Sequence, residues 1–268
     1  MSSEPIRFVK AEANGNDFLI VDAGGVAPRL RAGFARNICD RHRGVGADGV
    51  EFVRPAAAGF ELVLFNADGG EAELSGNGTR CVAAFYARRG FRCGPLLTAA
   101  GTLQATVIDG ENEEWTIELE MGVPRFEGHA TLTVLDDEIE AIVLSMGNPQ
   151  CVVRVLEFPA DWEAMGAALE SHPHFPHRTN VEFVRVVDRH HLEIRIFERG
   201  VGPTHSSGTG SCAAAVAAIR AGWADSPMQV TTPGGVQRVS WTGRDGSTVR
   251  LLGPARLVAE GLYFFAAS

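Results

Sequence analysis

The sequence has little basic charge and no long apolar run. Its 268 residues include 24 Lys and Arg against 33 Asp and Glu, which gives a net charge of −9. Nucleic acids and anionic membranes bind basic surfaces, so this balance argues against both as partners. The run Cys212–Ile219 is far shorter than the roughly 20 apolar residues that a membrane-spanning helix needs. Hydrophobic residues nevertheless make up 45% of the chain, enough for a folded core, which argues against disorder.

Cysteine is also scarce. The chain has five cysteines, an odd number, and no two of them form a Cys-x-x-Cys pair. This usage favours reduced thiols over a disulfide framework. The first residues, MSSEPIRF, include neither the basic nor the apolar stretch of a signal peptide. We therefore expect a cytoplasmic protein.

The chain contains an internal duplication. Gly15-Asn16 recurs as Gly147-Asn148, and Ser75–Gly78 (SGNG) recurs as Ser207–Gly210 (SGTG), at one constant offset. The pentapeptide VEFVR occurs identically at Val50–Arg54 and Val181–Arg185, with the offset shortened by one residue. Collinear matches at one offset indicate two copies of one fold, with the default ligand site in the cleft between them.

Apolar periodicity predicts a mixed α/β protein in two halves, residues 1–122 and 123–268. The boundary is expected at a Gly and a Pro near residues 122–124, and the segment of about 256–268 is expected to pack back on the N-terminal half. Four helices are expected at 31–41, 78–89, 161–170 and 209–222. Strands are expected at 6–10, 18–22, 50–54, 60–65, 103–108, 115–121, 139–145, 151–155, 181–187, 192–198, 236–241, 248–252 and 257–265.

Each half places Ser-Gly-x-Gly between a strand and a helix of small residues. Glycines let the backbone approach a ligand closely, and the first amides of a helix carry partial positive charge. The two turns are therefore candidate anion sites that need no basic side chain. If both faced one carboxylate, Ser75 and Ser207 would lie on opposite faces of the group attached to it. The simpler interpretation is that both serines are helix N-caps.

With these residues in view, the chain resembles the diaminopimelate epimerase family over nearly its whole length. The matching motifs are GNDF (15–18), RHRGVGADG (41–49), FNADGGEAE (65–73), SGNGTRC (75–81), SMGNP (145–149), TNVEF (179–183), ERGVG (198–202), SGTGSCAAAV (207–216) and PGG (233–235). The resemblance implies two pseudo-symmetric halves, each a curled, mainly antiparallel sheet around a central helix.

Enzymes of this family invert the α-carbon of an amino acid with neither cofactor nor metal. A thiolate removes the Cα proton while a thiol on the opposite face delivers another. The resemblance places Ser75 and Ser207 at these two acid–base positions and implies a diaminopimelate-like amino acid as substrate, as in lysine biosynthesis. It also allows a homodimer. The residues that it assigns to substrate binding are Asn16, Asn66, Gly76, Asn77, Asn148, Asn180, Glu198, Arg199, Gly208 and Thr209.

The sequence departs from the family at the two acid–base positions and at residues near them. A serine hydroxyl is a much weaker acid than a thiol and needs an adjacent base. Gln150 and Pro203 stand where the family usually has His and Glu. Several interpretations stay open: an epimerase adapted to a Ser/Ser pair, an inactive amino-acid-binding homologue, a Cys-to-Ser trapped variant, and a different isomerase or dehydratase of the same fold.

Other candidate sites are weaker. Gly44-x-Gly46-x-x-Gly49 fits a dinucleotide fingerprint, but a strand follows it where a helix is required. His172, His174 and His177 lie in a Pro-containing stretch typical of a solvated loop. His205 lies two residues before Ser207 and is either the missing base or a plain loop residue. Cys81 and Cys212 are expected to be buried packing residues.

Overall fold

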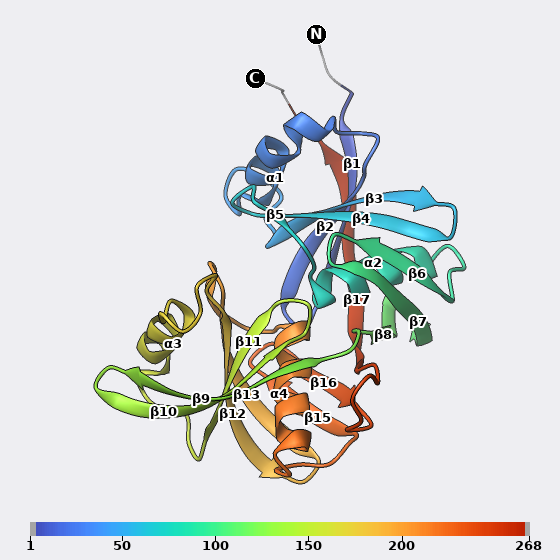
Figure 1. Ribbon diagram of the computed structural model, residues 1–268. Helices are drawn as coiled ribbons and strands as arrows, with labels where there is room; N and C mark the ends of the chain where they lie inside the picture. Colours follow the sequence, from blue (N-terminus) through green and yellow to red (C-terminus); the bar gives the residue numbers. More distant parts are fainter. Residues whose placement is uncertain (1–3, 266–268) are drawn as a thin grey trace. The chain divides into compact units, whose positions relative to one another are not determined.

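The computed structural model describes residues 4–265, whose contacts divide the chain into two compact units. Unit 1 extends to Leu119 and resumes at Gly253, and unit 2 is the continuous stretch Glu120–Leu252. Figure 1 shows strands and helices in both units, so the mixed α/β class predicted from the sequence is confirmed.

Unit 1 is built on a mainly antiparallel sheet. β1 pairs with β2 and with the second part of β17, β3 pairs with β4, and β6 pairs with β7, all antiparallel. The pairs β2–β3 and β4–β6 are parallel, and a helix connects the strands of each parallel pair. The strands are β1 (Ile6–Ala13), β2 (Asn16–Asp22), β3 (Gly49–Ala56), β4 (Gly59–Asn66), β5 (Glu71–Ala72), β6 (Cys93–Thr98), β7 (Gly101–Glu111), β8 (Glu114–Glu120) and β17 (Arg250–Tyr263).

Unit 2 repeats this topology. β10 pairs antiparallel with β9 and β11, as β1 does with β17 and β2, and the pairs β11–β12 and β13–β15 are parallel. The antiparallel pairs β12–β13 and β15–β16 correspond to β3–β4 and β6–β7. The strands are β9 (Arg125–Val134), β10 (Asp137–Ser145), β11 (Pro149–Val155), β12 (Asn180–Asp188), β13 (His191–Glu198), β14 (Gly202–Thr204), β15 (Met228–Thr232) and β16 (Gly235–Ser240). The expected pseudo-symmetry is thus confirmed in the strand pairing.

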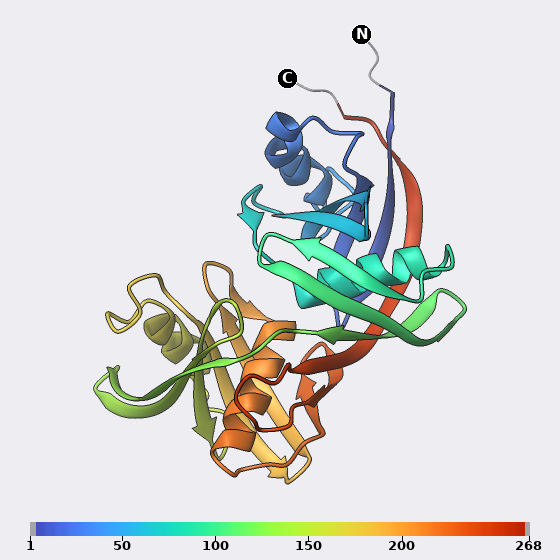
Figure 2. The same cartoon turned by 45° about the vertical axis from the view of Figure 1, so that its right-hand side comes forward.

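Each unit has one helix that is almost wholly buried. Ten of the twelve residues of α2 (Gly76–Ala87) and eleven of the thirteen residues of α4 (Gly208–Arg220) are buried. Both helices contain Ala residues, which favour the helix, and their many small side chains let the helix backbone lie close to the sheet. Figures 1 and 2 show each of them against the sheet of its own unit.

The second helix of each unit covers the other face of its sheet. Phe34 and Ile38 of α1 (Arg31–Cys39), which follows the short η1 (Pro28–Leu30), pack with Phe52 of β3. In unit 2, Leu169 of α3 (Trp162–Glu170) packs with Phe183 of β12. Because side chains alternate along a strand, the residue between two such core positions faces α2 or α4 instead.

The structure corrects part of the sequence-based assignment. The four expected helices are present, with ends shifted by up to two residues, but the strands β5, β6, β9, β14 and β15 were not expected. The segments 248–252 and 257–265, expected as two strands, belong to one strand, β17. Between the two ranges, β17 leaves β16 after Leu252 and continues along β1 from Arg256.

Candidate active site

Ser75 and Ser207 are the N-cap residues of the two central helices. Ser75 has extended backbone angles, and its Oγ accepts a hydrogen bond of 3.1 Å from the Gly78 amide. Ser207 repeats this geometry with a bond of 3.2 Å from the Gly210 amide. The N-cap interpretation is therefore correct for both serines. The cap bond itself does not use the hydroxyl proton, because the oxygen acts in it as an acceptor.

The turn of unit 1 is held by amide side chains and a buried arginine. Asn77 donates to Asn16 Oδ1 at 3.2 Å, and Asn16 donates to Asp48 Oδ2 at 2.6 Å. Arg80, which is fully buried on α2, donates to Asn77 Oδ1 at 2.7 Å and to Asn14 Oδ1 at 2.9 Å. The predicted binding residues Asn16 and Asn77 are thus hydrogen-bonded to each other, and the buried guanidinium of Arg80 holds Asn77 in place.

The turn of unit 2 is held by a neutral network. Gln150 donates to Asn148 Oδ1 at 2.6 Å, and Asn148 Nδ2 lies 3.4 Å from Thr209 Oγ1. Thr209 Oγ1 in turn lies 3.4 Å from Ser207 Oγ. Gln150, where the family usually has His, is fully buried. A continuous chain of polar groups therefore connects Gln150 to Ser207.

The remaining predicted binding residues lie close by in their own units. Asn180 begins β12 and accepts a bond of 3.0 Å from the Arg199 amide, while its Nδ2 donates to the Pro149 carbonyl. Glu198 ends β13, and Asn66 occupies the equivalent end of β4. The backbone of Gly76 and of Gly208 opens the two helices, and both residues are buried.

A charged cluster that the sequence analysis did not single out adjoins the turn of unit 1. Asp17 pairs with Lys10 at 2.8 Å and with Arg41 at 2.9 Å, and Arg41 also pairs with Asp48 at 2.8 Å. Burial raises the pKa of Asp17, but hydrogen bonds from Arg41 and Lys10 outweigh burial, so this pKa lies below its usual range. Through Asp48 the cluster fixes Asn16.

Two buried glutamates were also missed. Glu51 on β3 and Glu182 on β12 are 2% and 0% exposed. Burial raises the pKa of Glu51 to about 8 and the pKa of Glu182 well above its usual range. The sequence did contain a signal for them, because each occupies the one charged position inside an otherwise apolar run, VEFV.

The other candidate residues take less part in the site. Cys81 and Cys212 are fully buried, as expected, and burial raises the pKa of Cys81 well above its usual range. His205 is exposed, and His174 and His177 lie in an exposed loop after α3. Within residues 4–265 no group of three His, Cys, Asp or Glu side chains could hold a metal ion. Nor is any helix in this range long and apolar enough to cross a membrane.

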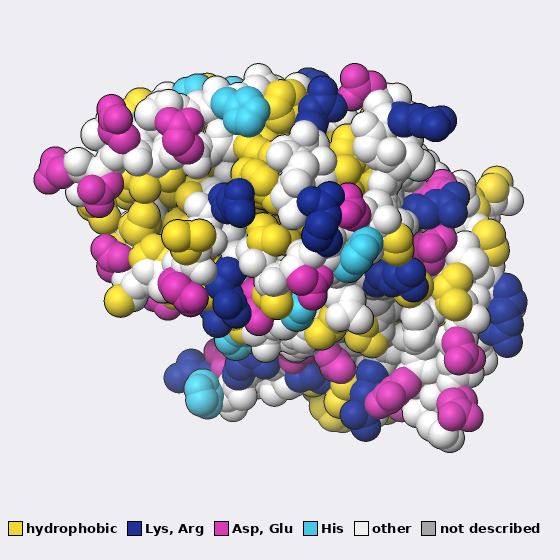
Figure 3. Space-filling model, turned by 90° about the horizontal axis from the view of Figure 1, so that it is seen from below, with side chains coloured by type: hydrophobic (Ala, Val, Ile, Leu, Met, Phe, Trp, Pro, Cys, Tyr) yellow, Lys and Arg dark blue, Asp and Glu magenta, His cyan; other side chains and the backbone are white. Residues whose placement is uncertain are grey.

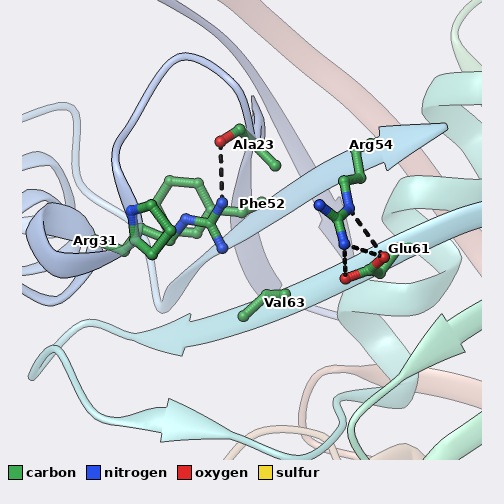
Figure 4. A pocket seen from close by; sticks show the side chains of 7 residues that line it. Ala23, Arg31, Phe52, Arg54, Glu61 and Val63 are labelled. Atoms are coloured by element: carbon green, nitrogen blue, oxygen red, sulfur yellow. Dashed lines mark hydrogen bonds and ion pairs between the residues drawn. The ribbon is translucent and has the colours of Figure 1, made fainter.

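A hollow of about 200 Å³ lies in unit 1, apart from the serine turn. Figure 4 shows Arg54 paired with Glu61 there, and Arg31 donating to the Ala23 carbonyl at 2.9 Å. The Arg31 guanidinium also lies over the Phe52 ring, 4.9 Å from its centre. None of the predicted site residues lines this hollow, and its charges are paired with each other or with the backbone.

The face of the molecule shown in Figure 3 carries acidic and basic side chains interspersed. Neither sign forms a broad field there. This face therefore lacks the basic stripe that a nucleic acid would bind.

Comparisons with known proteins show similarity in fold and in sequence. A hydroxyproline epimerase from Agrobacterium vitis has the same fold, with a TM-score of 0.75 at 16% identity, over 98% of this chain and 92% of that one. The structure thus belongs to the same fold class as that epimerase.

The sequence relationship is narrower. The family model "Diaminopimelate epimerase" matches residues 8–127 and 142–258. The diaminopimelate epimerases of Ectopseudomonas mendocina and Azotobacter vinelandii are 39% and 40% identical, each over 96% of this chain and 98% of the relative. The chain belongs to the diaminopimelate epimerase family.

Proposed function

We propose that this chain is an isomerase that inverts the α-carbon of a diaminopimelate-like amino acid, using Ser75 and Ser207 as its acid–base pair. The observation that carries the proposal is the repeated serine-capped helix start, at the positions where the resembled family has its two cysteines. The identity of about 40% to two enzymes named diaminopimelate epimerase supports the substrate class.

In this proposal the two helix starts hold the reacting carboxylate. The first amides of each helix, from Gly76 and Asn77 and from Gly208 and Thr209, have no intrahelical acceptor and suit an anion. The developing carbanion would then share its charge with a carboxylate that is already bound to fixed dipoles. Ser75 and Ser207 would act from opposite faces of the α-carbon, one removing a proton and the other supplying one.

The distal end of the substrate is assigned to Asn16, Asn66, Asn148, Asn180, Glu198 and Arg199. Arg199 offers a bidentate fork for a second carboxylate, and Glu198 offers a counter-charge for a second ammonium. A substrate with two amino-acid ends fits this set better than a simple amino acid does. We further propose a cytoplasmic enzyme that works without cofactor.

The test is proton exchange at the α-carbon. The protein is incubated with LL-diaminopimelate in D2O, and loss of the Cα–H signal is followed by NMR. We expect exchange in the wild type and a loss of at least about 100-fold in Ser75→Ala and in Ser207→Ala, the usual size of an acid–base contribution. Ser171→Ala, at the exposed end of α3, is the matched control and should exchange at the wild-type rate.

A second candidate, an amino-acid-binding homologue without turnover, has one observation in its favour. Both hydroxyls already serve as N-caps, a role that needs no chemistry. Tight binding of diaminopimelate without exchange in the wild type would contradict the isomerase and support this alternative. The double variant Ser75→Cys, Ser207→Cys would then show whether thiols restore exchange.

A further inference from the structure

The buried glutamates Glu51 and Glu182 occupy equivalent places in the two units. Their neighbours along the strands, such as Phe52 and Phe183, pack in the core clusters that contain α1 and α3. Strand alternation therefore turns both glutamates toward the opposite face, where α2 and α4 lie. Each carboxyl group is thus placed beneath the first turn of a serine-capped helix.

The surroundings of Gly78 and Gly210 confirm that each carboxyl group lies close to the first turn of its helix. A Cβ atom added to Gly78 would collide with Glu51 Oε1. A Cβ atom added to Gly210 would lie 2.8 Å from Glu182 Oε1 and 3.3 Å from Ser207 Oγ. A side chain at Gly78 would therefore enter space that Glu51 occupies, and one at Gly210 would enter space that Glu182 and Ser207 both adjoin.

Three of the four carboxyl oxygens of these glutamates make no hydrogen bond that would explain their burial. Both carboxyl oxygens of Glu182, and Oε2 of Glu51, are buried without a hydrogen-bond partner among the described residues. Buried polar groups without partners cost stability and are rare, so their presence in both copies calls for a role. Such a role needs a proton donor or acceptor that reaches them, and the serines that bond to the amides of these same glycines, Gly78 and Gly210, are candidates.

A serine cannot remove a Cα proton by itself, because its hydroxyl is too weak an acid to exist as an alkoxide near neutral pH. We propose that Glu51 and Glu182 are the proton-holding partners of Ser75 and Ser207. They act through the serines and do not touch the substrate, so they are positioning residues. This inference rests on the proposed function and deepens it by replacing the family's thiol pair with two serine–glutamate pairs.

The proton transfers balance. On one face the Cα–H bond breaks and its proton goes to the serine oxygen, while the hydroxyl proton of that serine moves to an ionised glutamate. On the other face a protonated glutamate gives its proton to the second serine, which delivers its own hydroxyl proton to the α-carbon. One proton leaves the substrate and one arrives, and the two glutamates exchange protonation states. The amide bonds to both Oγ atoms stabilise charge that develops there.

The electrostatic surroundings suit this exchange. A pKa of about 8 for Glu51, raised by burial, gives both protonation states near neutral pH. The pKa of Glu182 is raised by burial and further by Glu198 on β13. Burial raises the pKa of Cys81 on α2 and of Cys151 on β11, and the charge of Glu51 or Glu182 raises it further, so both thiols stay neutral. The other charged groups that act on Cys81 are Arg80, Glu12 and Asp17.

The experiment measures Cα–H exchange of LL-diaminopimelate in D2O from pH 6 to 10 for the wild type, Glu51→Gln and Glu182→Gln. Glutamine keeps the shape and the neutral state but cannot carry the proton. We expect each variant to lose about 100-fold or more of the rate with substrate half-saturation unchanged. The wild-type rate should rise toward about pH 8, and Glu51→Gln should lose this rise. Glu163→Gln, on the exposed side of α3, is the matched control and should behave as the wild type.

Each outcome decides the inference. Wild-type exchange together with Gln variants that keep their rate and pH profile overturns the serine–glutamate pairs and leaves the proposed function standing. Absence of exchange in the wild type overturns the proposed function and this inference with it. If a Gln variant fails to fold by circular dichroism, Glu51→Asp and Glu182→Asp replace it. A pH profile displaced by the aspartate supports the pairs, and an unchanged profile contradicts them.

Discussion

Each unit contains the same serine-capped turn at the start of its central helix, but different side chains support the turn in the two units. In unit 1 the turn is backed by a buried cation, Arg80, and by the ion pairs of Asp17 and Arg41. In unit 2 the position equivalent to Arg80 is Cys212, and neutral groups such as Gln150 connect to the turn. The serine cap, the glycines and the buried glutamate are shared. The shared features are therefore those that the proposed chemistry requires, whereas the supporting networks differ between the units.

The largest difference is expected for the residues at the equivalent position on the two central helices. Arg80→Ala leaves three acceptors without their donor and opens a cavity, so we expect a loss of about 4 kcal/mol in the free energy of unfolding. Cys212→Ala removes one buried sulfur and should cost about 1 kcal/mol. Urea denaturation of both variants measures the contrast, and equal losses would show that unit 1 does not depend on its buried cation.

The buried glutamates should make the stability fall with rising pH. The folded-state pKa of Glu51, about 8, lies above the unfolded value near 4.5, so its protonated form favours folding. This contribution is complete below about pH 4.5 and is lost as the pH rises through about 8, by on the order of 5 kcal/mol. Glu51→Gln removes this dependence, and Glu182→Gln should do the same in unit 2. Denaturation at pH 5, 6.5 and 8 measures it, and identical pH profiles for wild type and variant would refute it.

The two glycines that adjoin these carboxyl groups should differ in how much stability is lost when each is replaced by alanine. Gly78→Ala collides with the buried Glu51 and should cost about 2 kcal/mol, whereas Gly210→Ala meets Glu182 at 2.8 Å and should cost about 1 kcal/mol. Thermal unfolding ranks the two variants. Adding Glu51→Ala to Gly78→Ala provides the control, since the second change removes the clash and should recover part of the loss.

The smallest effect is expected at the ion pairs near the surface. Arg41→Met breaks pairs with Asp17 and Asp48 and should cost less than about 1 kcal/mol at pH 7, because Arg41 is more than half exposed. The pKa of Asp17 is lowered in the folded state, so this contribution is present at neutral pH and is lost as the pH falls through that lowered value. The cost of Arg41→Met should therefore vanish in acid. Arg178→Met, which breaks the pair with Glu170, is the counterpart in unit 2.

Much of the fold could be predicted from the sequence because the duplication gave each apolar run a second copy. The central helices followed from the Ala-rich runs after SGxG. The strand Cys93–Thr98 could not be predicted, because Gly94-Pro95 resembles a turn and the pairing of this strand is set by its neighbours. Strand β9 was missed because its outer residues are mostly polar and exposed.

The candidate site was predictable only where a motif marked it. Ser75, Ser207 and the asparagines follow from the matched motifs, and the capping geometry confirms one interpretation of the serines. Glu51 and Glu182 were read only as part of a repeat, because their meaning depends on which face of the strand they occupy. The Arg80 contacts depend on Asn14 and Pro254, which are far apart in the chain. Such contacts leave no local pattern.

The pairing of β1 with β17 has a consequence for how the protein is made. Ile6 of β1 lies opposite Tyr263 of β17, so one strand of unit 1 is synthesised before unit 2 and its partner strand is synthesised after it. Unit 2 is continuous and can complete its sheet while the chain is still growing. Unit 1 must wait for residues beyond Gly253 with the flank of β1 uncovered. The ribosome therefore delivers a finished C-proximal unit before the N-proximal one, the reverse of the usual order.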